Sequence, residues 1–275
     1  MNLGPFYKID STGLYRLNVF SGAKKNYCVV TGNHELFYRA SIKIKDGVLH
    51  ISAPVRGITI NVYAKNLLGV RLSNMLDPKI KSLSQSKMSM FINNVHHASF
   101  AGEFIIPHLI VNGYSHLSGK GKINIGTLNN TSAGTIIISG IQSKDMMINN
   151  VGSGKILLYG DIDAEQISQS GTGTIDIQKI NGSITTVISS GTGKIKLAGK
   201  TKKLIATLTG KTFLNAKRLN AKVALIKTAN SAQANINPLI QLFAYASGQS
   251  QINYYSKPPL LYRNTTPQGL ILPML

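Results

Sequence analysis

The sequence predicts an all-β fold, a parallel β-helix built from a repeat of about 20 residues. The first observation is the composition. Gly occurs 26 times, Trp is absent, and Ile, Ser, Thr and Asn fill short alternating runs that favour strands. The second observation is a recurrent Gly-rich turn, each time followed by a strand-like run. The third is that apolar residues recur in columns with the same period as the turns.

Four turns mark the repeat: "SAGTIIISG" from Ser132, "GSGKILLYG" from Gly152, "GTGTIDIQ" from Gly171 and "GTGKIKLAG" from Gly191. The first isoleucine after each turn recurs at spacings of 20, 19 and 20 residues, at Ile136, Ile156, Ile175 and Ile195. Two further columns share these spacings: Ile138, Leu158, Ile177 and Leu197, and Leu128, Ile148, Ile167 and Val187. Side chains two positions apart share one face of a strand, so the columns predict buried ladders.

The Gly-x-Gly turns are interpreted as corners of the coil, where Gly supplies a positive φ. A phosphate-binding loop would instead lead into the N-terminus of a helix. The repeat is also too short for a propeller blade, and it lacks the signature of leucine-rich repeats.

Three regions are expected along the chain. Residues 1–55 alternate like a strand meander that begins the coil or caps its end, and "IKIKDGVLHI" predicts a hairpin turning at Asp-Gly. Residues 56–258 form the β-helix. Residues 259–275 are a proline-containing tail, and we expect the prolines before and within it to stop strand addition.

The charge is strongly positive. Thirty Lys and Arg face ten Asp and Glu, for a net charge of +20. Most of the cations are Lys, a hydrated point charge that suits diffuse attraction to anionic surfaces. One segment holds eight basic residues and no acid, and stacked rungs could gather them into a polyanion-binding stripe: Lys200, Lys202, Lys203, Lys211, Lys217, Arg218, Lys222 and Lys227. The alternative is a solvated, solubilising surface. Few aromatic residues accompany the stripe, which argues against specific nucleic-acid binding.

Little in the sequence points to catalysis. The one acidic cluster, Asp161, Asp163 and Glu165, could share a face and hold Ca²⁺ or hydrolyse a glycoside, but an exposed acidic edge is the simpler interpretation. His96 and His116 lie one period apart and are interpreted as surface imidazoles, because a metal site needs more converging ligands. We therefore expect no catalytic residue, metal or cofactor.

Three further features bear on the setting. The single cysteine, Cys28, excludes an internal disulfide and is expected to be buried in a strand. The sequence contains no run of about 18 apolar residues, so it predicts no membrane-spanning helix. The start "MNLGPFYKID" does not resemble a signal peptide, although a protein whose signal had been removed would look the same.

Four features occur in order along the chain: "KDGVLHIS", "ITINVYAKNLLGVRLSN", the corners "SGKGKI", "GSGKI", "SGTGTI" and "SGTGKI", and the closing "SGQSQINYYSKPPLL". By these features the sequence resembles, over roughly residues 7–260, the auto-transporter adhesin head domain, or GIN domain, of bacterial envelope proteins. The resemblance implies a right-handed β-helix, an envelope location and adhesive or structural work, with no catalytic residues to carry over. The chain departs from the family at Lys155, Thr174 and Lys194, where members commonly carry Asp, and at Lys257, which replaces a glycine.

The predicted function is therefore that of a non-catalytic, adhesin-like or scaffolding β-helix of the bacterial cell envelope, in the periplasm, on the outer membrane or secreted, whose signal peptide is absent from this sequence. The expected partners are an acidic glycan, lipopolysaccharide or an envelope protein. The alternative is a polyanion-binding module, which a continuous Lys stripe would favour. A more distant alternative is a carbohydrate-active enzyme, which a carboxylate-lined groove would favour.

Overall fold

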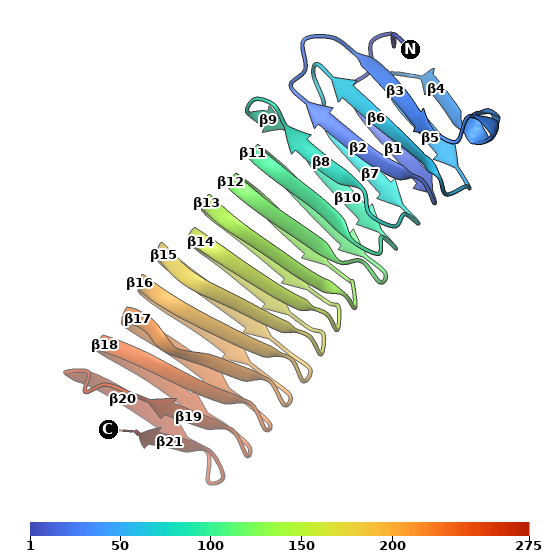
Figure 1. Ribbon diagram of the computed structural model, residues 1–275. Helices are drawn as coiled ribbons and strands as arrows, with labels where there is room; N and C mark the ends of the chain where they lie inside the picture. Colours follow the sequence, from blue (N-terminus) through green and yellow to red (C-terminus); the bar gives the residue numbers. More distant parts are fainter. Residues whose placement is uncertain (275) are drawn as a thin grey trace. The chain divides into compact units, whose positions relative to one another are not determined.

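The computed structural model describes residues 1–274, and nearly all of its regular structure is β-strand (Figure 1). Strands of successive rungs pair in parallel. Many paired residues are 19 or 20 positions apart, as Lys155 and Thr174 or Ile175 and Ile195 are, and the spacing falls to 17 or 18 where the register shifts, as between Asn220 and Asn237. The chain is thus a parallel β-solenoid, which confirms the predicted fold class. It comprises two compact units: unit 1 (residues 1–125 and 132–140) and unit 2 (residues 126–131 and 141–275). The predicted boundaries after residues 55 and 258 stay predictions.

Unit 1 contains mostly short strands, and it holds the one 3-10 helix found within residues 1–274. Its elements are β1 (Lys8–Gly13), β2 (Arg16–Ser21), β3 (Tyr27–Gly32), η1 (His34–Arg39), β4 (Ser41–Lys45), β5 (Val48–Ala53), β6 (Ile58–Ala64), β7 (Gly69–Ser73), β8 (Lys79–Ser82), β9 (Ser86–Lys87), β10 (Ser89–Asn93) and β11 (Ala98–Asn112). Two further long strands, β12 (Leu117–Asn130) and β13 (Thr135–Asn150), have residues in both units.

The first two strands lie inside the stack of unit 1. β1 pairs in parallel with both β5 and β7, and β2 pairs in parallel with both β6 and β8. The edges of β5 and β6 are covered instead by antiparallel partners, β4 and β3. The N-terminal segment therefore has two roles. β1 and β2 contribute to a rung of the solenoid, because each is paired on both sides, and β3 and β4 cover an edge of it.

The hairpin predicted at Asp-Gly is confirmed. β4 and β5 pair antiparallel on either side of Asp46 and Gly47, whose φ angles are 51° and 72°. Two successive positive φ angles are those of a type I′ turn, which matches the twist of the strands that it joins. The buried strand position predicted for Cys28 is confirmed on β3, and burial raises the pKa of its thiol.

Unit 2 stacks long strands in register. Its further strands are β14 (Lys155–Gln169), β15 (Thr174–Ser189), β16 (Lys194–Leu208), β17 (Phe213–Thr228), β18 (Gln233–Ala246), β19 (Gln251–Tyr254), β20 (Leu260–Thr265) and β21 (Leu270–Pro273). From β14 to β18 each strand pairs in parallel with the next. β18 then pairs with β19 and β20, and β19 with β21.

All twelve residues of the three predicted apolar columns are buried. Within unit 2 the register also joins neighbours of each column, as Ile156 pairs with Ile175 and Ile175 with Ile195. The core of unit 2 is therefore built from ladders of identical or similar side chains, each about 4.8 Å from the next.

The expectation that the prolines would end strand addition is wrong. β20 and β21 follow Pro258 and Pro259 and pair in parallel with β18 and β19. The two prolines lie in the connection between β19 and β20. Here they remove no backbone donor from a ladder, so the sheet resumes after them.

The explanation of the Gly-x-Gly corners also changes. Gly191 has a positive φ of 94°, but Gly171, Gly173 and Gly193 do not. A Cβ atom on Gly171 or Gly173 would lie 2.3 Å from a backbone oxygen of the preceding corner. Most of these glycines are thus required by the close approach of stacked corners. Positive φ angles recur instead at the bend inside the long strands, at Gly160 and Gly199.

Polar side chains also enter the interior. Asn130 and Asn150 are buried, and the Asn130 Nδ2 group donates to the Asn150 Oδ1 atom over 2.8 Å. In the next rung the buried Gln169 donates from Nε2 to the Gly173 carbonyl over 2.6 Å. Each of these bonds links consecutive rungs or an amide to a nearby corner, as buried polar groups generally require. The partnering is incomplete, because Asn150 Nδ2 and Gln169 Oε1 are buried without a hydrogen-bond partner among residues 1–274.

Candidate functional site

The predicted acidic cluster lies on β14. Asp161, Asp163 and Glu165 point outward, with buried Ile162 and Ala164 between them, which confirms their common side of the strand. They differ in their surroundings. Asp161 accepts a hydrogen bond from Lys179 Nζ at 2.9 Å, and hydrogen bonding to Lys179 and Asn181 lowers its pKa.

Asp163 has the opposite electrostatic setting. Partial burial raises its pKa, repulsion from Asp145 adds to this rise, and a backbone hydrogen bond at Ser183 opposes it. Over residues 1–274, no group of three or more His, Cys, Asp or Glu side chains has the arrangement of a metal site. The arrangement fits an acidic strand edge that is partly neutralised by lysine.

In unit 1, His96 lies beside an acid and close to a second histidine. His96 Nδ1 lies 3.8 Å from Asp77 Oδ1, and the rings of His96 and His116 have centroids 6.5 Å apart with planes tilted by 59°. His116 Nδ1 accepts from the Thr135 N–H at 3.1 Å, and His97 Nε2 lies 3.3 Å from Ser118 Oγ. His96 and His116, one period apart in the sequence, are thus neighbours in the structure, with tilted rings.

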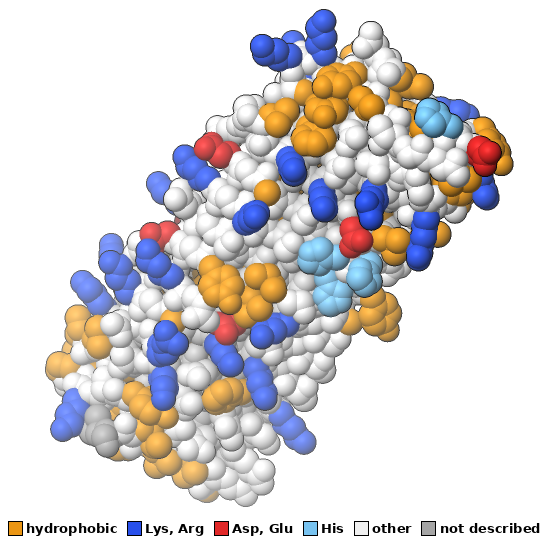
Figure 2. Space-filling view, viewed as in Figure 1, with side chains coloured by type: hydrophobic (Ala, Val, Ile, Leu, Met, Phe, Trp, Pro, Cys, Tyr) orange, Lys and Arg blue, Asp and Glu red, His pale blue; other side chains and the backbone are white. Residues whose placement is uncertain are grey.

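Basic side chains are spread over the face seen in Figure 2, and acidic ones are few. In unit 2, Thr201 pairs with Ala221 and Lys203 with Val223, which sets Lys202 beside Lys222 on neighbouring strands. Both of these lysines are exposed. This is the one place where the predicted stripe brings two of its members into adjacent positions of a ladder.

The other predicted basic residues occupy separate positions. Lys200 pairs with Asn220, and Lys227 with Thr207. Lys217 lies within a shift in the register of β16 and β17, and Arg218 pairs with Ala198 directly after it. The Lys217 Nζ atom lies 5.2 Å from the centre of the Tyr255 ring. Lys211 lies at the corner between β16 and β17. Across the strands, therefore, one pair of lysines is adjacent, and neutral residues lie opposite Lys200, Lys203, Arg218 and Lys227.

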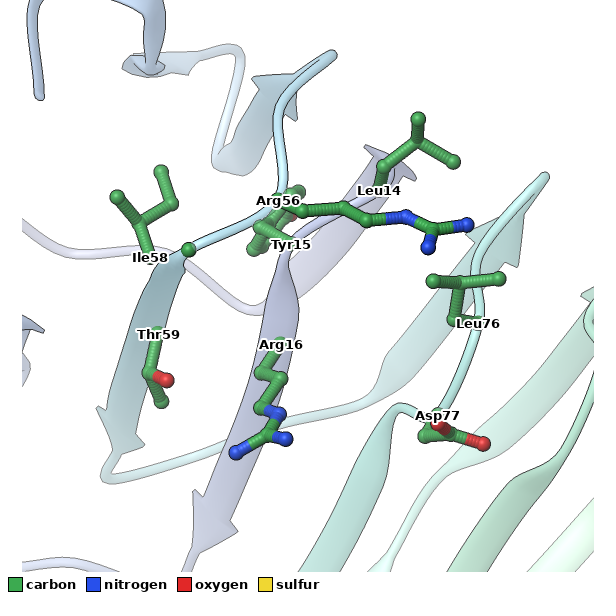
Figure 3. Close-up of a pocket in the computed structure, with 9 residues that line it drawn as sticks. Leu14, Tyr15, Arg16, Arg56, Ile58, Thr59, Leu76 and Asp77 are labelled. Atoms are coloured by element: carbon green, nitrogen blue, oxygen red, sulfur yellow. The ribbon is translucent and has the colours of Figure 1, made fainter. Parts of the chain in front are cut away.

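Sequence reasoning missed a basic hollow in unit 1, which Figure 3 shows. Its volume is about 420 Å³, and it is lined by Arg16, Arg56 and Asp77 together with Leu14 and Leu76. Arg56 extends between Leu14 and Leu76 in this view. No local motif marks the hollow, because its residues come from three separate segments of the chain.

A second depression in unit 1, of about 350 Å³, has Gly69 in its lining. On one side, Arg71 lies over the Phe91 ring with 4.6 Å between the guanidinium carbon and the ring centre. His50 Nδ1 lies 3.9 Å from Asp10 Oδ2 nearby. Both depressions are open and mixed in charge, and neither brings paired carboxylates together as glycoside hydrolysis requires.

No helix within residues 1–274 has the length and apolar character needed to cross a bilayer.

Several solved structures are similar to this chain. A putative adhesin from Parabacteroides merdae ATCC 43184 is 15% identical, with 100% of this chain and 94% of that one covered and a TM-score of 0.41. A putative adhesin from Bacteroides fragilis NCTC 9343 is 13% identical, with coverage of 100% and 94% and a TM-score of 0.36. A putative lipid binding protein from Parabacteroides distasonis ATCC 8503 is 14% identical, with coverage of 100% and 95% and a TM-score of 0.40.

None of the curated proteins matches this chain. The family model described as "Putative auto-transporter adhesin, head GIN domain" matches residues 5–195 and 163–258, which together span most of the chain. The motifs on which the resemblance rested lie almost entirely within these ranges. The chain belongs to this family of auto-transporter adhesin head domains.

Proposed function

We propose that this chain is a non-catalytic binding or scaffolding protein of the bacterial cell envelope. Membership of an adhesin family supports the proposal. The observation that carries it is the register of β14 to β18, in which outward side chains of successive strands line up in columns. Such a surface repeats at the strand spacing of about 4.8 Å and suits an extended partner better than a small substrate.

The location is tested in the source bacterium by fractionation. Cells are separated into cytoplasm, periplasm, outer membrane and medium, and an antibody against the purified chain detects the protein in each fraction. A strain that lacks the gene supplies the background signal. We expect the protein outside the cytoplasm, and a signal confined to the cytoplasm would overturn the envelope proposal.

The absence of catalysis is tested separately. The purified chain is incubated with acidic and neutral polysaccharides, and the release of new reducing ends or unsaturated products is measured. We expect no cleavage, because Asp161 is paired with Lys179 and no second carboxylate faces it across a groove. Turnover that disappears in Asp163→Asn would make the chain an enzyme.

A second candidate function, polyanion binding, is favoured by the adjacent exposed lysines Lys202 and Lys222. Like charges on neighbouring strands repel, so an anionic partner relieves an unfavourable arrangement. The wild-type chain should elute later from heparin than from a sulfonate exchanger of equal charge density, and retention should fall with salt because exposed charges are screened.

Matched variants separate a site from general charge. Lys202→Ser with Lys222→Ser should lower heparin retention more than Lys120→Ser with Lys122→Ser, two exposed lysines outside the predicted segment. Both double variants remove two positive charges. Equal elution of the two variants would mean that Lys202 and Lys222 form no binding site and belong to a solubilising surface.

A further inference from the structure

One outward face of unit 2 is unusually apolar. It is formed by three columns that run across five strands with a continuous register: Ile184, Lys203, Val223, Gln241 and Leu260; Thr186, Ile205, Leu225, Phe243 and Tyr262; Ile188, Thr207, Lys227, Tyr245 and Asn264. We call these fifteen residues the C-terminal face. Nine of them are aliphatic or aromatic, although the alternate residues of the same strands already fill the core.

Six of the nine apolar members of this face are exposed, and the other three, Ile205, Val223 and Leu225, are half-buried. Ile184 and Ile188 are 47% and 49% exposed, and at the other end of the face Leu260 and Tyr262 are 48% and 55% exposed. Phe243 and Tyr262 stack with ring centres 4.8 Å apart and planes within 7°. Side chains on the outer side of a sheet are expected to be polar when water is their only partner, so a contiguous apolar face marks an interaction surface.

The charge around the face narrows the choice of partner. After Asp176 the remaining 99 residues contain 13 Lys and Arg and not one Asp or Glu. Two of these cations, Lys203 and Lys227, lie within the face itself. Lys202 and Lys222 lie directly beside it. The partner must therefore offer an apolar layer and negative charge together.

A second copy of the chain fits this requirement poorly. Two C-terminal faces in contact would bring lysines toward lysines, with no carboxylate on either side to pair with them. The face also covers only roughly 400 Å², from five strands about 4.8 Å apart and about five residues in length. Stable protein interfaces bury about 800 Å² on each partner.

An anionic bilayer meets both requirements. An interfacial protein needs only shallow burial of its apolar side chains at the boundary of headgroups and acyl chains. Tyrosine is favoured at this depth, and lysine can bury its aliphatic stem while the ammonium group stays among the phosphates. We propose that the C-terminal face docks unit 2 on a bilayer surface rich in anionic lipid. The inference rests on the proposed envelope location, since it specifies which envelope component this chain contacts.

The test is co-sedimentation of the purified chain with vesicles. One set is pure phosphatidylcholine, and the other contains equal parts phosphatidylcholine and phosphatidylglycerol. We expect binding to the anionic vesicles to be tighter by about tenfold or more, since each lysine near an anionic surface contributes to affinity. Added salt should weaken this binding without abolishing it, because the apolar contribution is not screened.

Two pairs of substitutions separate the contributions. Phe243→Ser with Tyr262→Ser should weaken binding to anionic vesicles by about tenfold, since each removes a large apolar group from the interface, and should leave heparin retention unchanged. Lys203→Gln with Lys227→Gln should reduce the preference for anionic over neutral vesicles. The matched control, Val151→Ser with Tyr159→Ser, removes two exposed apolar side chains of unit 2 that lie off the face and should bind as the wild type does.

Several results would overturn the proposal. These are no sedimentation with anionic vesicles, equal binding to both vesicle types, or equal loss in the control and in the Phe243 and Tyr262 variant. Self-association that this variant abolishes, without any vesicle binding, would assign the face to a second copy. If that variant does not fold, Ile188→Ser with Leu260→Ser replaces it. Failure in this assay leaves fractionation outside the cytoplasm as a separate result, so the two proposals can fail independently.

Discussion

Thr228 and Ser250 bring their side-chain oxygens to within 2.8 Å of each other inside unit 2, where both residues are buried. Thr228 ends β17, and Ser250 directly precedes β19. Neither hydroxyl is near bulk water, so each depends on the other for a partner. A polar contact of this kind links one rung to a later one in a core that is held mainly by non-directional apolar packing.

The pair can be tested with a double-mutant cycle. Thr228→Val keeps the side-chain shape but leaves the Ser250 hydroxyl buried without this partner, which should lower the free energy of unfolding by about 1–3 kcal/mol. Ser250→Ala should act similarly. The double variant removes both polar groups and should be less destabilised than the sum of the singles, as measured by urea unfolding. Simple additivity would mean that the two hydroxyls do not depend on each other.

The apolar ladders give a second prediction. Ile175 is buried and pairs with Ile156 on one side and Ile195 on the other. Ile175→Asp would place an unpaired carboxylate in this ladder and should destabilise the chain by several kcal/mol. Thr207→Asp adds the same charge at an exposed position of β16 and should melt close to the wild type. Unchanged melting of the Ile175 variant would contradict the ladder.

The ladders could be predicted because they combine two signals. Ile156, Ile175 and Ile195 are all apolar and recur at a nearly constant spacing. Only a ladder of side chains that point into the core accounts for both properties. The Asp46–Gly47 turn was predictable for a local reason, since two successive positive φ angles favour this dipeptide. Features with such a local or periodic cause can be predicted from a single amino-acid sequence.

Other features have causes that no single segment contains. The position of β1 between β5 and β7 depends on pairing between residues about 40 and 60 positions apart, as Lys8 with Val48 and with Gly69. The C-terminal face was missed for a different reason. In a run such as "LFAYA", every position is apolar, so the alternation that distinguishes the core side from the outer side is absent.

The bend inside the long strands supplies a third prediction. Gly199 has a φ of +118°, and a Cβ atom there would lie 2.2 Å from the Ile180 backbone oxygen in the preceding rung. Gly199→Ala should therefore lower the free energy of unfolding by at least ~1–3 kcal/mol from backbone strain, with the steric clash added. Gly69 provides the control, because its φ is not positive and the nearest atom to a new Cβ would be 3.6 Å away. Gly69→Ala should be neutral or slightly stabilising. Equal melting of the two variants would contradict this explanation of the bend.

The last prediction concerns pH and uses two aspartates of β14 with opposite pKa shifts. The pKa of Asp163 is raised, first by partial burial and then by Asp145. The folded state therefore holds this proton at pH values where the unfolded chain has released it, and stability falls as pH rises through the ordinary range near about 4. Above that window, Asp163→Asn should melt at a higher temperature than the wild type, and the difference should vanish in acid, where the wild-type carboxyl is also neutral.

Asp161 provides the internal control, since hydrogen bonding to Lys179 lowers its pKa. Its contribution is present above the ordinary range and is lost as pH falls through the folded value. Asp161→Asn should therefore melt slightly lower than the wild type at neutral pH, the reverse of Asp163→Asn, and salt should reduce this effect because the ion pair with Lys179 is exposed. The test is to measure the melting temperatures of both variants and the wild type from acid to neutral pH. Shifts of the same sign at neutral pH would show that the two carboxylates share one environment, and would remove the distinction between the lysine-paired end of the cluster and its partly buried centre.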